Sequence, residues 1–295
     1  MTDDSTLPFT GERFTPECVR EIWYEHWHRY AFARRLAAGR RVLDAACGEG
    51  YGSAMLSEVA ADVVGVDLDE AAVAHARSRY AALPRLRYER ADATALPFAD
   101  ASFDLVVSFE TLEHLAAQEQ LLQGFARVLA DDGVLVISSP DKRTYSELAG
   151  FRNEFHVREL YRDELVSLLR PHFPSIRLYG QKLLFQSALW SLDGAPVTSE
   201  ALTAQRSDET VRAGLAYAPM YFVAVCARHE LPAALPDLSL FGDDQESVYA
   251  HYNHEIRKNM SAGMRIAELE AELERLRARP ASAPARDWRW WRRNR

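Results

Sequence analysis

Short apolar runs alternate with helix-forming segments along the chain from about residue 40 onward. Each run is rich in valine, leucine or isoleucine and is bounded by turn residues, a pattern that predicts buried strands. Seven strands are expected, at residues 40–46, 62–69, 85–93, 102–110, 131–140, 175–181 and 219–227. No clear crossover helix separates the last two, so one of them is expected to be antiparallel. The pattern predicts an α/β fold: a Rossmann-like, doubly wound, mostly parallel seven-stranded sheet covered on both faces.

Two flanks lie outside this predicted core. Residues 22–36 read IWYEHWHRYAFARRL, an aromatic helix that we expect at the mouth of the sheet. Ile266, Leu269, Leu273 and Leu276 have heptad spacing and predict a short coiled-coil helix. The predicted organisation is an N-terminal lid segment (1–38), a core domain (39–230), a linker with a helix (231–263), the coiled-coil helix (264–279) and a basic aromatic tail (280–295).

Composition narrows the class of protein. The 295 residues suit one sizeable α/β domain with an appendage, and 48% hydrophobic with 26% charged residues is ordinary for a globular protein. A net charge of −8 argues against a body that wraps nucleic acid, so no nucleic-acid partner is expected. Three widely spaced cysteines, Cys18, Cys47 and Cys226, indicate a reducing compartment. With a polar N-terminal start and no apolar run of about 18 residues, a cytoplasmic location is expected.

The first predicted strand runs directly into a glycine-rich loop. VLDAACGEGYG, at 42–52, places Gly48, Gly50 and Gly52 at G-x-G-x-G spacing. Such density predicts that a ligand approaches the backbone at a strand-to-helix turn. A nicotinamide dinucleotide loop requires G-x-G-x-x-G, and Ser53 stands where the third glycine of that motif belongs. The spacing therefore disfavours NAD.

The loop resembles the first motif of class I S-adenosylmethionine-dependent methyltransferases, D-x-G-x-G-x-G. Asp44, Gly48 and Gly50 match this motif, while Ala46 replaces its first glycine. The resemblance covers about residues 9–230. The segments TGERFTPE, YEHWHRYAFA and SSPDKRTYSE with NEFHVREL resemble in particular the methyltransferases of bacterial cell-surface polysaccharide clusters.

This resemblance implies a set of contacts with S-adenosylmethionine. Asp67, at the end of the second strand, would accept hydrogen bonds from both ribose hydroxyls, and Asp92 would accept one from the adenine amino group. Arg29 lies where ubiquinone-pathway O-methyltransferases place an arginine on the cofactor carboxylate. The implied cofactor-binding residues are Arg29, Asp44, Ala46, Cys47, Gly48, Gly50, Gly52, Asp67, Leu68, Asp92, Ala93 and Phe109. For each acid taken alone, a helix cap or a solvated loop is the alternative.

A second constellation follows the fourth strand. FETLEHL places Glu110, Glu113 and His114 at i, i+3 and i+4, which predicts one face of the first turn of a helix. This motif resembles the E-x-x-E-H through which some quinone-pathway and RNA 3′-terminal O-methyltransferases bind Mg²⁺. The resemblance implies His156 as the fourth ligand. Mg²⁺, Mn²⁺ or Fe²⁺ there would hold a vicinal diol and lower its hydroxyl pKa. Two alternatives stay open: His114 or His156 as a metal-free general base, and an acceptor that needs no base.

These patterns predict a methyltransferase that modifies a sugar hydroxyl, or a phosphate, in bacterial surface-glycan or nucleotide-sugar metabolism. The acceptor is expected to be a small molecule or a lipid-linked glycan. One alternative is a small-molecule O-methyltransferase of quinone or secondary metabolism, and another is a non-catalytic scaffold that keeps the cofactor fold. The aromatic residues of the N-terminal helix either stack on a sugar ring or pack the helix onto the sheet; they are Trp23, Tyr24, Trp27 and Tyr30.

The C-terminal segments predict further partners. In the tail, Trp288, Trp290 and Trp291 interleave with arginines, which favours peripheral contact with an anionic inner membrane surface. A basic tail without a partner is the alternative. The heptad helix predicts a homo-oligomer, although two heptads are few for an isolated coiled coil.

Overall fold

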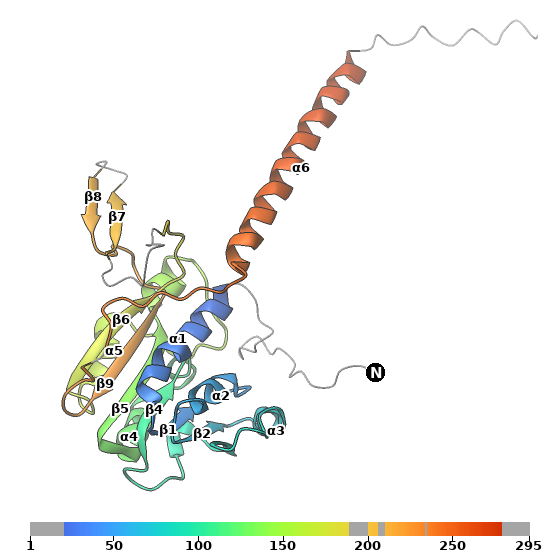
Figure 1. Ribbon diagram of the computed structural model, residues 1–295. Helices are drawn as coiled ribbons and strands as arrows, with labels where there is room; N and C mark the ends of the chain where they lie inside the picture. The colour runs from blue at the N-terminus through green and yellow to red at the C-terminus, as the bar shows by residue number, and fades with distance from the viewer. Residues whose placement is uncertain (1–20, 189–199, 206–209, 234, 279–295) are drawn as a thin grey trace, which may run out of the picture. The chain divides into compact units, whose positions relative to one another are not determined.

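The computed structural model describes residues 21–188, 200–205, 210–233 and 235–278 (Figure 1). The predictions for TGERFTPE and for the basic aromatic tail lie outside these ranges. The chain divides into two compact units, residues 1–241 and 242–295, and each is described by itself.

The first unit is built on a seven-stranded sheet with the order β3-β2-β1-β4-β5-β9-β6. Its strands are β1 (Arg41–Ala45), β2 (Asp62–Asp67), β3 (Leu86–Arg90), β4 (Phe103–Ser108), β5 (Leu129–Pro140), β6 (Ser175–Gln181) and β9 (Tyr221–Ala227). The first five run parallel, and β9 lies antiparallel between β5 and β6. The predicted fold class, including its single antiparallel strand, is confirmed.

A separate two-stranded hairpin, β7 (Leu202–Gln205) and β8 (Thr210–Ala213), joins β6 to β9 in the chain. The sequence analysis did not predict it. The strand β8 has only four residues and all of them are exposed, so it lacks the buried apolar face that makes a strand recognisable.

Helices cover both faces of the large sheet (Figure 1). On one face α1 (Glu21–Ala37) and α2 (Tyr51–Ser57) pack in a core with sheet residues such as Val63 and Val107. On the other face α4 (Gln118–Val128) and α5 (Arg162–Leu169) pack with Leu43 and Val64. Helix α3 (Glu70–Arg79) packs through Val73 and Ala76 on Tyr88 of β3. The near-continuous apolar strands are explained by this two-sided burial.

Helix α1 is an integral layer of the fold, and its description as a lid is corrected. Arg29, Tyr30, Phe32, Ala33, Leu36 and Ala37 are buried. The Trp23 and Trp27 rings stack at 5.0 Å, and Trp27 stacks on Tyr51 of α2 at 5.8 Å. The packing alternative therefore accounts for both tryptophans.

In the second unit, α6 (Ser247–Arg277) is one continuous helix of 31 residues. The predicted boundary between 263 and 264 falls inside this helix and is wrong. The first unit extends to Phe241, beyond the predicted core limit of 230, and Leu231 and Leu235 pack in the α1 face of the core. Within the described part of the chain, no helix has the length and apolarity needed to cross a membrane.

Candidate functional site

The predicted cofactor loop lies at the carboxyl ends of β1 and β2, the edge where open α/β sheets bind ligands. Ala46, Gly48 and Gly50 have left-handed backbones, with φ of 60°, 56° and 94°. The positive φ of Ala46 explains why the related motif has glycine there, because a Cβ disfavours this conformation. Cys47 is buried, and its N–H donates to the Val66 carbonyl at 2.9 Å, which ties the loop to β2.

Two of the loop glycines are required by neighbouring tyrosines. A Cβ on Gly52 would lie 2.0 Å from the Tyr30 ring, and a Cβ on Gly50 would lie 2.7 Å from the Tyr88 hydroxyl. Gly52 sits in the first turn of α2 and is buried. The prediction that a ligand explains this glycine is therefore corrected: close packing of Tyr30 does so.

Asp44 lies beneath the loop and is completely buried. Its carboxylate accepts hydrogen bonds from the Ser53 hydroxyl at 2.6 Å and from the Tyr30 hydroxyl at 3.1 Å. Burial raises the pKa of Asp44 to about 7, against the lowering effect of these two hydrogen bonds. Ser53, which breaks the dinucleotide motif, thus holds Asp44 in place.

Asp67, at the end of β2, fits the predicted ribose contact. One oxygen accepts the Gly48 N–H at 2.8 Å and the other accepts the Asp69 N–H at 3.0 Å. The carboxylate is therefore fixed against the glycine loop, and each oxygen keeps lone-pair capacity for a donor. Leu68, the predicted adenine contact, follows Asp67 directly in the chain and has 62% of its surface exposed.

The remaining predicted contacts lie after β3 and β4. Asp92 caps the short 3₁₀ helix Ala93–Ala95, because one of its oxygens accepts from the Thr94 N–H at 2.8 Å and from the Thr94 hydroxyl at 2.7 Å. The capping alternative is thus realised, and the other oxygen remains for a ligand. Phe109 is buried edge-to-face against Tyr30, with ring centroids 4.9 Å apart.

Arg29 is 2% exposed, yet both of its terminal nitrogens lack a hydrogen bond. Its Nε donates to Gln181 Oε1 at 2.7 Å, its Nη1 lies 3.3 Å from Glu110 Oε1, and its guanidinium lies over the Tyr221 ring at 4.5 Å. A buried guanidinium with orphaned donors is costly unless a ligand satisfies them. The observation fits a cofactor carboxylate, as predicted.

Glu110 departs from the predicted helix face. It adopts a left-handed backbone with φ 49°, ahead of a 3₁₀ turn at Leu112–His114, and α4 begins only at Gln118. The prediction of an i, i+3, i+4 ligand face is therefore wrong. Such a conformation costs a non-glycine residue about 1–3 kcal/mol. The Ser138 hydroxyl holds Glu110 by accepting its N–H at 3.1 Å and donating to its Oε1 at 2.6 Å.

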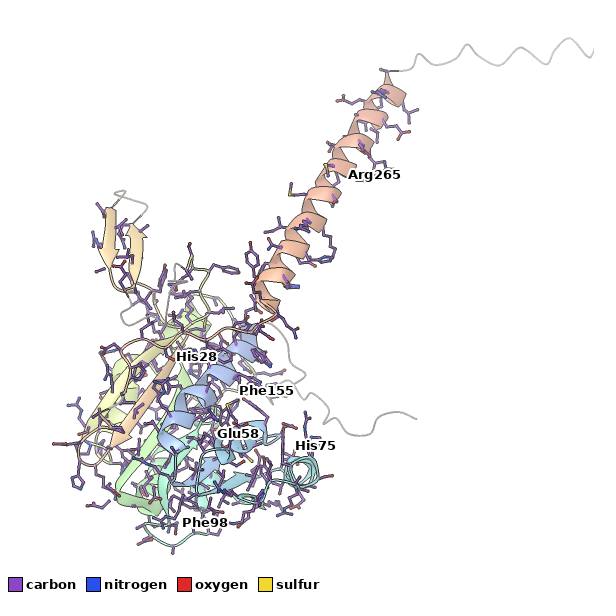
Figure 2. All side chains as sticks on the ribbon, viewed as in Figure 1. His28, Glu58, His75, Phe98, Phe155 and Arg265 are labelled. Carbon is purple, nitrogen blue, oxygen red and sulfur yellow. The ribbon has the colours of Figure 1, made fainter. Side chains whose placement is uncertain are left out.

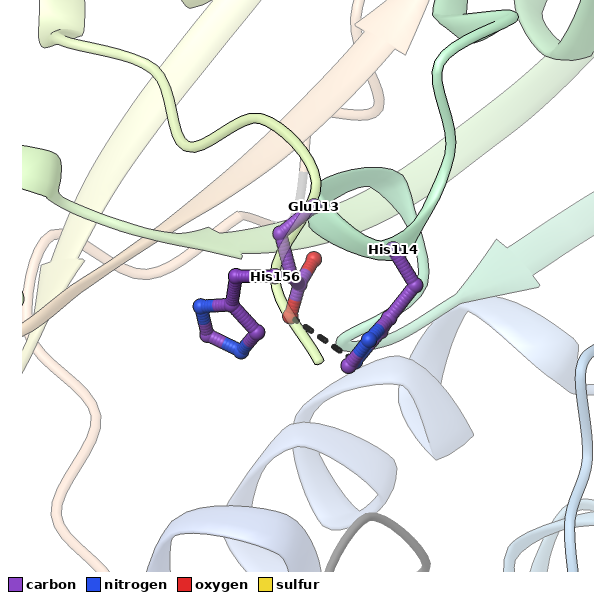
Figure 3. Close-up of side chains that lie close together, drawn as sticks. All are labelled: Glu113, His114 and His156. Carbon is purple, nitrogen blue, oxygen red and sulfur yellow. Dashed lines mark ion pairs between the residues drawn. The ribbon is translucent and has the colours of Figure 1, made fainter. Parts of the chain in front are cut away.

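Three of the four predicted metal ligands do come together. One ligand atom each from Glu113, His114 and His156 lies within 4.8 Å of the others (Figure 3). Both Glu113 oxygens are buried without a hydrogen-bond partner, and burial, with Glu110 nearby, raises the pKa of Glu113 well above its usual range. An orphaned buried carboxylate beside two imidazoles fits a divalent cation. Glu110 is not part of this cluster.

The two imidazoles are oriented by fixed partners. His114 Nδ1 lies 3.1 Å from the carbonyl of Phe155, which only accepts, so Nδ1 carries the hydrogen and Nε2 has the lone pair. His156 Nδ1 donates to Glu159 at 2.6 Å. Its Nε2 accepts from the Asn153 amide at 3.0 Å. Metal binding by His156 would therefore replace this last hydrogen bond.

A cavity of about 890 Å³ adjoins the site and shares Arg29 with it. It lies along β6 and β9, away from the glycine loop and Asp67, neither of which lines it. Glu25 lines it and was missed by the sequence analysis. Burial, opposed by Arg29, raises the pKa of Glu25 to about 7. Its place four residues before Arg29 on one helix was the only sequence signal, and it indicates an ion pair.

Comparison with known proteins agrees with this geometry. Residues 43–137 match the family described as "Methyltransferase domain". A probable S-adenosylmethionine-dependent methyltransferase of Mycolicibacterium smegmatis is 43% identical over 168 residues, 56% of this chain and 64% of the relative. The ubiquinone biosynthesis O-methyltransferase of Sinorhizobium medicae is 30% identical over 157 residues, 52% of this chain and 63% of the relative. Residues 43–137 are thus similar to a methyltransferase domain.

A solved structure supports the fold alone. A putative methyltransferase of Bacillus halodurans superposes with a TM-score of 0.50 at 17% identity, covering 68% of this chain and 98% of that one. The fold is therefore Rossmann-like, with a mostly parallel seven-stranded sheet. The chain spans 64% of the length of the Mycolicibacterium relative and 60% of a similar Mycobacterium tuberculosis protein.

Proposed function

We propose that this protein is an S-adenosylmethionine-dependent O-methyltransferase. The observation that carries the proposal is the hydrogen bond from Gly48 to Asp67, which joins the glycine loop to a ribose-binding carboxylate inside the matched domain. When bound, S-adenosylmethionine supplies a methyl group on a positively charged sulfur, and the acceptor oxygen forms the C–O bond as the S–C bond breaks. Arg29 would hold the carboxylate of the cofactor and Leu68 would cover its adenine.

Calorimetric titration with S-adenosylmethionine and S-adenosylhomocysteine tests this proposal. Asp67→Ala should weaken both by about tenfold or more, because hydrogen bonds to a charged group contribute roughly 1.5–3 kcal/mol each. Asp62→Ala, at the exposed start of β2, is the matched control and should bind like the wild type. Tight NADH binding without S-adenosylmethionine binding would overturn the proposal. Cofactor binding without turnover of any acceptor would favour the scaffold alternative.

We propose a hydroxyl of a sugar as the acceptor, on a small molecule or a lipid-linked glycan. Aromatic residues such as Tyr24 and Tyr179 line the cavity beside Arg29, and aromatic faces suit sugar rings. The alternative acceptor is a quinone or secondary metabolite, because relatives include a demethylmenaquinone methyltransferase of Clavibacter sepedonicus, 40% identical over 111 residues. Mass analysis of products from both acceptor classes discriminates between them.

For the acceptor proton we propose the Glu113, His114 and His156 cluster. With Mg²⁺ or Mn²⁺ bound, these side chains would be ligands and the cation would lower the pKa of the acceptor hydroxyl. Without metal, His114 is the proposed base, because the Asn153 amide already donates to Nε2 of His156.

We also propose two further partners. Pairing of α6 would form a homodimer, and the basic aromatic tail would contact an anionic membrane surface. Vesicle co-sedimentation with anionic lipid, comparing the full chain with one that ends at Arg279, tests the second; equal pelleting of the two would overturn it.

A further inference from the structure

The cavity beside Arg29 has an unusual distribution of polar and apolar side chains. Ligand cavities usually present apolar walls with a few polar groups that fix orientation. Here Arg29, 2% exposed, and the largely buried Glu25 form a polar floor. Gln181 supports this floor, since its amide oxygen accepts from Arg29 Nε at 2.7 Å and its amide nitrogen donates to the Glu25 carbonyl at 2.9 Å.

Large apolar side chains form one wall of the same cavity, alongside exposed charged residues such as Asp163 and Asp237. Leu215, Tyr217 and Leu240 all line it and expose 44%, 44% and 74% of their surface. Single exposed leucines are common, but large apolar side chains gathered on one opening mark a binding surface. Leu183, Leu184 and Leu238 continue this wall. A ligand in the cavity would thus contact this apolar wall as well as the polar floor.

The charges of the lining select against a polyanion. Four cations, Arg29, Arg143, Arg162 and Lys182, are opposed by Asp141, Asp163 and Asp237 and in part by Glu25, whose pKa is raised to about 7, so the net charge of the lining stays close to zero. His28 adds no charge near neutral pH. Burial, and to a smaller extent the positive charge of Arg29, lower its pKa to about 4. A diphosphate would find no net positive field there.

We propose that this cavity binds an uncharged amphiphile, with a hydroxylated head group against Glu25 and Arg29 and an apolar chain along the leucine wall. The volume of about 890 Å³ lies in the upper part of the range for drug-sized ligands, so it accommodates a ring together with a chain. This inference rests on the proposed methyltransferase function, which it deepens. Within that function it favours a lipid-linked or alkylated acceptor over a nucleotide-sugar.

Calorimetry with methyl, hexyl and octyl β-D-glucoside, below their micelle concentrations, tests the inference, with UDP-glucose as the charged probe. Burial of each methylene contributes about 0.8 kcal/mol. Partial burial should therefore make octyl glucoside at least threefold tighter than hexyl glucoside, and UDP-glucose should bind no better than methyl glucoside. Leu215→Asp and Leu240→Asp should each weaken octyl glucoside at least fivefold. Val211→Asp, an equally exposed change on β8 outside the cavity, should not.

Three results would overturn the inference: affinity independent of chain length, tightest binding of UDP-glucose, or equal weakening by all three variants. S-adenosylhomocysteine binding is measured on the same samples. If it is retained in every variant, the fold is intact and any failure concerns the cavity alone. If the wild type does not bind it, the proposed function fails instead.

Discussion

Single residues decide how the site is held. Asp44 is completely buried, and its ordinary pKa of 3.8 rises to about 7 in the folded protein. The folded state therefore binds a proton more tightly than the unfolded state does. The sign follows from linkage: this stabilisation is fully present below pH 3.8 and is lost as the pH rises to about 7.

We predict that Asp44→Asn removes this loss. The difference in the free energy of unfolding, variant minus wild type, should increase between pH 4 and pH 7. The increase should reach up to about 4 kcal/mol, at 1.36 kcal/mol per pKa unit. Urea unfolding at several pH values measures it. Asp104→Asn is the control, because the Arg41 hydrogen bond lowers the pKa of Asp104 and its difference from the wild type should be flat above pH 5. A flat Asp44→Asn difference would contradict the prediction.

A second residue-scale prediction concerns the Glu113, His114 and His156 cluster. If it binds a metal, EDTA should abolish turnover and Mg²⁺ or Mn²⁺ should restore it, because both Glu113 oxygens are buried without a hydrogen bond and their ion-pair contact with His114 Nε2 is long, at 3.9 Å. His114→Ala should then weaken Mn²⁺ binding, measured by electron paramagnetic resonance, by at least tenfold. His172→Ala, a change at a histidine that contacts Glu119 outside the cluster, is the control. Full activity in EDTA would leave His114 as a base, and slow turnover of His114→Ala would still be expected.

At the scale of elements, α1 and α2 fit together through one glycine. We predict that Gly52→Ala lowers the free energy of unfolding by about 2 kcal/mol or more, as expected for an overpacked core. The reason is that its Cβ would lie 2.0 Å from the Tyr30 ring. Gly124→Ala in α4 is the matched control: its Cβ would lie 3.7 Å from the Ala93 carbonyl oxygen, an ordinary van der Waals contact, and helix propensity favours alanine. Thermal unfolding measures both. Partial rescue of Gly52→Ala by Tyr30→Leu would identify the clash as the cause.

The helices and strands also show which features of the fold can be predicted from the sequence. Apolar runs predicted every strand of the large sheet, because two-sided burial leaves a strong pattern. The spacing of Glu110, Glu113 and His114 predicted a helix face and failed, since Glu110 is held in a left-handed conformation by Ser138 of β5, 28 residues away. Likewise, Gly52 was assigned to a ligand when Tyr30 fills the space. Contacts between distant segments decided both, and local spacing contains no information about them.

At the scale of the whole molecule, α6 has features of a pairing helix. None of its residues except Val248 is buried, and Leu269, Leu273 and Leu276 expose 47%, 46% and 58% of their surface. With Ile266 at position a and Leu269 at position d, the heptads also place Asn259 at a. Isoleucine at a with leucine at d favours two parallel strands, and a buried asparagine at a fixes their register.

The charges of α6 make the orientation testable. Figure 2 labels Arg265 on α6. In a parallel dimer, position g of one helix meets position e of the next heptad on the other, which pairs Arg265 with Glu270 of the partner subunit and Glu272 with Arg277 of the partner subunit. We predict a concentration-dependent dimer in sedimentation equilibrium. Leu269→Asp should abolish it and Glu270→Arg should weaken it.

The combined exchange Arg265→Glu with Glu270→Arg should restore the dimer that Glu270→Arg weakens, because it re-forms the opposite-charge pair with the signs reversed. Glu274→Arg, at the outward position b of the same helix, makes the same change in net charge as Glu270→Arg and should leave the association constant unchanged. High salt should reduce the difference between these two variants, since exposed ion pairs are screened. A monomer at every concentration, or equal effects of Glu270→Arg and Glu274→Arg, would contradict pairing through this face.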